Sequence, residues 1–178
     1  NGGRITADQT LTIWENGTLE GSGEIVGTLV NHGTINVGLE PLPPEGGDVQ
    51  ALAAFGVQPG TLTVAGSMTI APGSRLQLDF VGPDQYDRLA VSGAAQLDGA
   101  LTLAFSEGYA PRAGDSFAFV GAGSSTGTFS TVRVTGLELG WQFSLSNSGG
   151  VTTLRSESDA VATTTPTLER VYLPLIRR

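Results

Sequence analysis

The sequence contains no cysteine, no lysine and a single histidine, His32. The absence of cysteine excludes a disulfide scaffold and thiolate metal sites. The absence of lysine excludes a P-loop, which needs that side chain on the nucleotide phosphates. No segment approaches the ~20 apolar residues that a membrane-spanning helix requires. We therefore predict no cofactor and no membrane span.

Charge is also scarce, because only 15% of the residues are charged and the net charge is −8. Nucleic acids and anionic membranes are bound by basic patches, so an acidic chain argues against both partners. The charge is uneven. Residues 1–154 carry 5 Arg and 14 acidic residues, a net −9, whereas residues 155–178 carry 4 Arg and 3 acidic residues, a net +1. The two parts of the chain thus have opposite charge.

Short alternating runs of apolar and polar residues make up most of the remaining sequence. Examples are "TLTIW" (10–14), "GTLTVAGSMTI" (60–70) and "AQLDGALTLAF" (95–105). Such runs, rich in Thr, Val and Leu and bounded by Gly, Asp or Pro-Gly, are typical of β-strands. The 26 glycines supply the corners that many turns require. No segment has a convincing helical period, so we expect an all-β fold.

The spacing of the turns favours a parallel β-solenoid over a β-sandwich, which remains the alternative. The run "LEGSGEIVGTLVNHGTINVG" (19–38) changes direction every few residues, whereas sandwich turns usually lie about 8–12 residues apart. With about 20 residues per coil, residues 1–155 would form about seven or eight coils. One continuous core would then form from the inward positions Leu29, Ile35, Val37, Leu62, Val64, Met68 and Ile70.

Several of these runs carry a resemblance to a known group of proteins. The segments "GTLTV" (60–64), "YDRLAVSG" (86–93), "LDGALTL" (97–103) and "GTFSTV" (127–132), together with "GSGEIVGTLVNHGTINVG" (21–38), are similar to the passenger-type β-solenoid repeats of bacterial autotransporters and related secreted surface proteins. This resemblance implies a right-handed parallel β-helix, secreted to the cell surface, and implies no catalytic site. The ending "VYLPLIRR" resembles the terminus of secreted proteins from Chloroflexota-type bacteria.

Changes in composition divide the chain into five segments. We predict N-terminal solenoid coils (1–38), a loop excursion rich in Pro and Gly (39–60), a main solenoid stack (61–155), a flexible linker (156–170) and a C-terminal docking strand (171–178). Because the chain begins with Asn1 and not Met, we also expect that a signal peptide or upstream region has been removed.

Three aspartates form the only cluster with potential chemistry. Asp79, Asp84 and Asp87 lie within nine residues, beside Arg88. Oxygen ligands of this kind form a weak candidate for a Ca²⁺ site, or an acid/base pair of a polysaccharide lyase or hydrolase. The competing interpretation is that they stabilise a turn, and we predict no catalytic residue and no enzymatic activity. Asn16, in "NGT", is a candidate glycosylation acceptor.

The C-terminal strand is the strongest functional signal. Residues 171–176 are apolar on both faces of a strand, so an isolated tail would expose a hydrophobic edge. It can cap its own solenoid, act as a sorting signal, or dock on the next subunit and build a filament. We favour docking, because the tail is positively charged and the body is acidic. The predicted interface is Val171, Tyr172, Leu173, Pro174, Leu175, Ile176, Arg177 and Arg178.

The sequence as a whole thus predicts an extracellular, non-enzymatic subunit whose main partner is a second copy of itself. The alternatives are an adhesin or carbohydrate-binding surface protein, with a surface polysaccharide as partner, and the polysaccharide-cleaving enzyme that would use the three aspartates.

Overall fold

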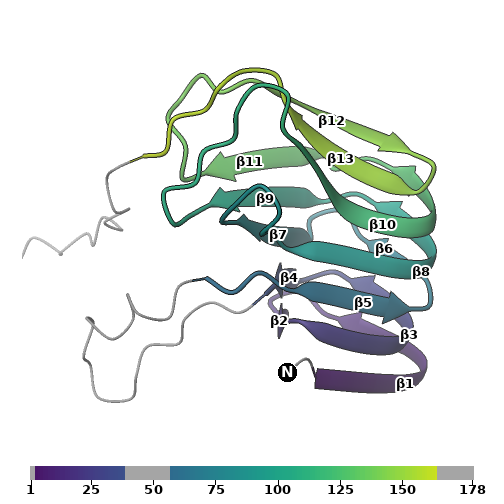
Figure 1. Cartoon of the computed structure of the whole chain (residues 1–178). Coiled ribbons are helices and arrows are strands. Elements are labelled where there is room, and N and C mark those ends of the chain that lie inside the picture. The colour runs from purple at the N-terminus through teal and green to yellow at the C-terminus, as the bar shows by residue number, and fades with distance from the viewer. Residues whose placement is uncertain (1–2, 39–56, 164–178) are drawn as a thin grey trace, which may run out of the picture.

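The computed structural model describes residues 3–38 and 57–163, and these residues form strands and loops without a helix. The all-β prediction is therefore confirmed. The strands form two sheets (Figure 1). The larger sheet contains β1 (Gly3–Ile13), β3 (Gly23–Asn31), β5 (Thr61–Ala65), β6 (Met68–Ile70), β8 (Arg88–Leu97), β10 (Ser116–Gly127), β12 (Phe143–Ser148) and β13 (Val151–Ser156). The smaller sheet contains β2 (Thr18–Gly21), β4 (Thr34–Val37), β7 (Arg75–Phe80), β9 (Ala100–Phe105) and β11 (Thr131–Thr135).

From β1 to β11 the chain alternates between the two sheets, and each visit to the larger sheet followed by one to the smaller sheet is called a pass here. Successive passes pair in parallel, so that β1, β3, β5, β8 and β10 follow one another in one sheet and β2, β4, β7, β9 and β11 in the other (Figure 1). The described residues make five passes, not the seven or eight coils predicted. The expected repeat of about 20 was wrong because only the first pass is that short.

The register shows how the repeat lengthens along the chain. Leu11 pairs with Leu29, 18 positions later. Leu76 pairs with Leu101, 25 positions later, and Val91 pairs with Ala122, 31 positions later. Parallel neighbours of this kind need a crossover connection, and these connections can differ in length without changing the ladder.

The core lies between the two sheets. All seven positions predicted to point inward are buried, with exposures of 4% or less, and they belong to one hydrophobic cluster. Their burial follows from the alternation of the strands, since β4 and β5 bury every second residue. Each of these side chains contributes about 1.5–3 kcal/mol when it leaves water.

Glycines stack at one corner of the larger sheet. If Gly66 carried a Cβ atom, that atom would lie 2.2 Å from the carbonyl oxygen of Gly27. A Cβ on Gly93 would lie 2.8 Å from the oxygen of Gly66, and one on Gly123 would lie 2.8 Å from the oxygen of Ser92. Here β5 gives way to β6, and the registers of β1 and β10 shift. We call Gly27, Gly66, Gly93 and Gly123 the glycine corner. Side chains are excluded there by the backbone of the preceding pass.

A hairpin closes the C-terminal end of the core. Strands β12 and β13 pair antiparallel with each other, and β13 pairs antiparallel with β10. The ring of Trp141 packs on Phe105 and Phe143, with centroid distances of 5.2 and 4.9 Å, and its Nε1 donates a hydrogen bond to Ser156 Oγ at 2.7 Å. This end of the core is therefore covered by aromatic side chains and by an antiparallel ladder (Figure 1).

Residues 157–163, which the sequence assigns to the flexible linker, lie against the body. The carboxylate of Asp159 accepts a hydrogen bond from the N–H of Ala113, and the N–H of Thr163 donates to Gly136 O. Leu137 and Ala162 form an antiparallel bridge. A polar composition does not distinguish a free linker from an extended segment held by backbone hydrogen bonds. The rest of the predicted linker and the docking strand lie outside the described residues, as does most of the excursion at 39–60.

Candidate functional site

The N-terminal end of the two sheets differs from the hairpin end, and we call it the open end. In the part of the chain that the structure describes, β1 and β2 are outermost and each pairs with a strand on one side only. A strand of this kind presents unpaired N–H and C=O groups that can pair with another strand. Ile5 in β1 is 42% exposed, and Trp14 just after β1 is 72% exposed. The open end therefore combines unpaired backbone with exposed apolar side chains.

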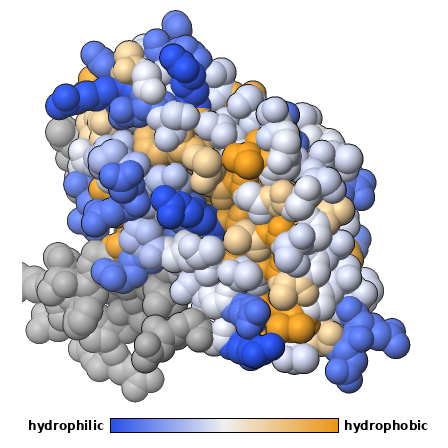
Figure 2. All heavy atoms as spheres, turned by 45° about the vertical axis from the view of Figure 1, so that its right-hand side comes forward, coloured by the Kyte–Doolittle hydropathy of each residue, from blue (hydrophilic) through white to orange (hydrophobic). Residues whose placement is uncertain are grey.

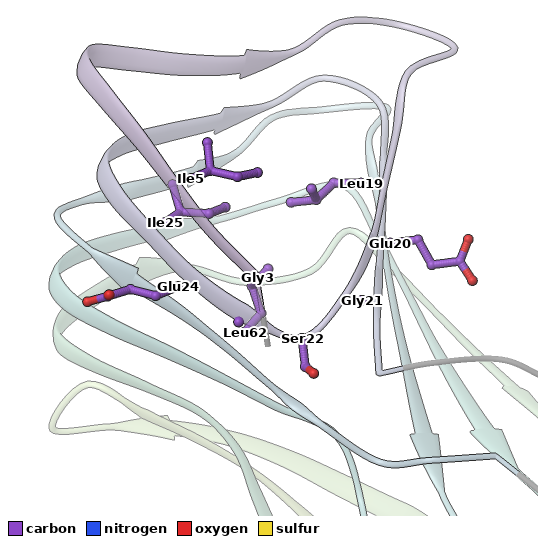
Figure 3. A pocket seen from close by; sticks show the side chains of 10 residues that line it. Gly3, Ile5, Leu19, Glu20, Gly21, Ser22, Glu24, Ile25 and Leu62 are labelled. Carbon is purple, nitrogen blue, oxygen red and sulfur yellow. The ribbon is translucent and has the colours of Figure 1, made fainter. Parts of the chain in front are cut away.

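A pocket of about 250 Å³ lies at the open end, between β1 and β2 (Figure 3). Figure 3 shows Leu19 pointing across this space toward Ile5 and Ile25, while Glu20 and Glu24 point away from it. Its floor is thus apolar and its rim acidic. Beside it, a more open hollow of about 500 Å³ is lined by Ile5, Leu11, Ile13, Leu19 and Trp14 among others.

The charge of the open end is negative. Residues 3–24 contain four acidic side chains, Asp8, Glu15, Glu20 and Glu24, and one Arg. That Arg4 forms an exposed ion pair with Glu24, with Nε and Oε2 3.3 Å apart. The remaining carboxylates favour a cationic segment over an anionic one. Hydrophobic residues also form a band across several passes on the face shown in Figure 2, with hydrophilic residues beside it at the lower end.

Of the three predicted aspartates, Asp87 is fully buried and structural. Its Oδ1 accepts a hydrogen bond from the N–H of Gly60 at 2.7 Å, and its Oδ2 accepts one from the N–H of Asp79 at 2.8 Å. Its own N–H donates to Asp79 O at 2.9 Å. The carboxylate thus ties the end of β7 to the segment before β5, close to Gly38, where a Cβ would lie 2.5 Å from Oδ1.

The other two aspartates do not complete a catalytic or metal site with Asp87. Asp79 is 4% exposed. Asp84 is exposed and lines an open pocket of about 550 Å³ with Tyr86 and Arg88, whose Cζ lies 4.5 Å from the centre of the Tyr86 ring. Across residues 3–38 and 57–163, no three His, Cys, Asp or Glu side chains are grouped so that they could hold a metal ion. The turn-stabilising interpretation fits the contacts of Asp87.

Tyr109 is the titratable group most affected by its surroundings. Burial, followed by the nearby charges of Asp115 and Asp84, raises the pKa of Tyr109 to about 12. Its ring packs against Phe105 and Phe117, with centroid distances of 6.3 and 6.4 Å. Tyr109 is therefore a core aromatic residue that stays neutral at physiological pH.

Asn16 lies in the turn after β1, is exposed and has a φ of 66°. Its side chain is accessible, and glycosylation at this position stays a prediction. The predicted assembly residues, Val171, Tyr172, Leu173, Pro174, Leu175, Ile176, Arg177 and Arg178, lie outside the described residues. Nothing in the described part has the length and apolarity of a membrane-spanning helix.

Sequence analysis missed the open end and two outward arginines, Arg75 and Arg133. The strand pattern shows which residues alternate, but the end of a sheet and the neighbours across a ladder depend on the parallel register.

No protein-family model matches the chain, and a search of the curated proteins finds no significant match. The resemblance to autotransporter passenger repeats therefore stays a prediction.

Proposed function

We propose that the protein is a secreted structural subunit, a short right-handed parallel β-solenoid that assembles head to tail through its C-terminal strand. The observation that carries this proposal is the open end, where unpaired backbone of β1 and β2 surrounds an apolar pocket. Strand addition at such an edge uses main-chain hydrogen bonds for affinity and side-chain pockets for specificity.

The tail of a second copy fits this surface in length, polarity and charge. Residues 171–176 would extend for about 20 Å as a strand, which is enough to run beside half of β1. Residues 169–178 carry three Arg and one Glu, and the acidic rim of the open end carries the opposite sign. Pro174 has no N–H, so only the other residues of the tail would donate to the ladder.

The two ends of the body would lead to an open chain of subunits. The tail leaves the body beyond Thr163, which bonds to Gly136 in the loop after β11, whereas the acceptor is at β1 (Figure 1). A contact between two different surfaces does not close on itself unless its rotation happens to form a ring, and it otherwise propagates as a filament.

Deletion of residues 166–178 tests the proposal. We expect the full-length protein to form filaments in electron micrographs and the truncated protein to stay monomeric, with unchanged circular dichroism and thermal melting of the body. Identical filaments from the truncated protein, or a full-length protein that is monomeric at all concentrations, would contradict the proposal.

A second variant tests the acceptor. Ile5→Glu places a charge in the apolar pocket, on a residue that is already 42% exposed, so the body should still fold. Leu139→Glu is the matched control, since Leu139 is fully exposed and distant from β1 in the sequence. Assembly should be lost with Ile5→Glu and kept with Leu139→Glu. Equal assembly of the two variants would place the acceptor elsewhere.

A further inference from the structure

The outward face of the smaller sheet carries a shallow groove of about 270 Å³ that is separate from the open end. It is lined by polar and small side chains from four neighbouring strands, namely Thr34, Arg75, Gln77, Thr102, Ala104, Arg133 and Thr135. Because parallel strands repeat the same inward and outward alternation, these side chains lie on one face.

Two arginines flank the groove. Arg75 belongs to β7 and Arg133 to β11, and β9 runs between these two strands. Their backbones are offset by two residues, since Arg75 is paired with Ala100 and Arg133 with Thr102. Two strand spacings and two residues of rise separate the Cα atoms by about 12 Å, so both long side chains can reach the floor of the groove.

The floor is low because β9 contributes small side chains there. Ala104 and Thr102 line the groove, and Ala100 occupies the next outward position of the same strand. A ligand group can therefore lie between the two arginines and close to the sheet. The hydroxyl of Thr102 and the amide of Gln77 offer hydrogen bonds at the same level, because these residues are in register.

The charge around the groove is unusual for this protein. Its net charge is −8, yet no carboxylate lines the groove. Arg75 and Arg133 are exposed, and neither side chain has an ion pair with another residue of the described ranges. The carboxylates on the same face are Asp79, which is buried, and Glu20, which lies in the outermost strand. Two cations without counter-ions thus flank a polar groove.

We propose that this groove binds a linear acidic polysaccharide through its carboxylate groups. An arginine fork matches a carboxylate with two parallel hydrogen bonds, and hydroxyl and amide side chains suit sugar hydroxyls. The groove is open and crosses four strands, which suits a chain laid over the sheet better than an enclosed small molecule. It contains no aromatic side chain on which a nucleic-acid base would stack. This binding would be an activity in addition to assembly.

Binding of polygalacturonate to the full-length protein, measured by titration calorimetry, tests the proposal. We expect binding to polygalacturonate and none to neutral dextran. Arg75→Gln and Arg133→Gln should each weaken binding about tenfold, because a hydrogen bond to a charged group is worth roughly that factor or more. Arg75→Lys should recover only part of the loss, because lysine keeps the charge but not the fork.

Arg112→Gln is the matched control, since it removes the same charge from an exposed position before β10. It should leave binding unchanged. Three results would overturn the proposal: no binding of polygalacturonate, equal losses for Arg112→Gln and the groove variants, or equal binding of dextran. Tight binding of dextran sulfate without binding of polygalacturonate would likewise refute the carboxylate assignment. These arms do not depend on the tail, so failure here leaves the assembly proposal intact.

Discussion

Replacement of Gly66 by alanine should destabilise the protein although it adds only one methyl group. The new Cβ would lie 2.2 Å from Gly27 O and 2.7 Å from Gly27 C, both backbone atoms of β3. Real Cβ contacts are almost never shorter than 3.0 Å, so the two passes must separate by most of an ångström. Overpacking of this kind costs about 1–3 kcal/mol.

The matched control is Gly121→Ala, in β10. A Cβ on Gly121 meets nothing within 4 Å, and this glycine is exposed. Alanine in a strand interior is about 0.5–1 kcal/mol better than glycine, so this variant should be neutral or slightly stabilised. Urea denaturation should then separate the two variants by about 2 kcal/mol, and thermal melting by several degrees.

The reasoning is refuted if Gly66→Ala is as stable as Gly121→Ala at equal m-value. That result would mean that the passes can move apart without cost, and that the glycines at this corner do not limit the approach of the backbones. A change in m-value alone would instead point to an altered denatured state.

Two further predictions concern buried polar groups. Asp87→Asn replaces one acceptor of the Gly60 and Asp79 N–H groups by a donor, and should cost about 1–3 kcal/mol in urea denaturation. Asp84→Asn, at an exposed position, should cost nearly nothing, and equal losses would contradict the assigned role of Asp87. Burial raises the pKa of Tyr109 to about 12, so the neutral phenol is favoured in the folded state. Its contribution to stability is complete below pH ~10, the pKa of an unfolded tyrosine, and is lost as the pH rises toward 12. Tyr109→Phe should lose less stability across that interval, and identical alkaline profiles would contradict this.

The sequence predicts the strand class and the core well, because both depend on local alternation. Leu62, Val64, Met68 and Ile70 alternate with threonine, alanine and serine, and all four are buried. The number of passes is not local. It depends on which residues pair across the ladder, and the wrong repeat length came from extending the short first pass to the whole chain.

The candidate sites were harder to predict than the core. Asp79, Asp84 and Asp87 were correctly singled out by their density, but the sequence does not indicate that Asp87 turns inward to backbone N–H groups. Arg75 and Arg133 are 58 positions apart. They meet over one groove only because β7 and β11 both pair with β9.

The glycine corner also determines where this chain can change in length. From each corner glycine to the matching start of the next strand in the smaller sheet, the distance is nearly constant: 7 positions from Gly27 to Thr34, 9 from Gly66 to Arg75, 7 from Gly93 to Ala100 and 8 from Gly123 to Thr131. The return to the next corner takes 32, 18 and 23 positions. Insertions have therefore accumulated on one side of the molecule only. A peptide grafted between β9 and β10 should be tolerated, whereas one of the same length between Gly93 and β9 would have to break the corner.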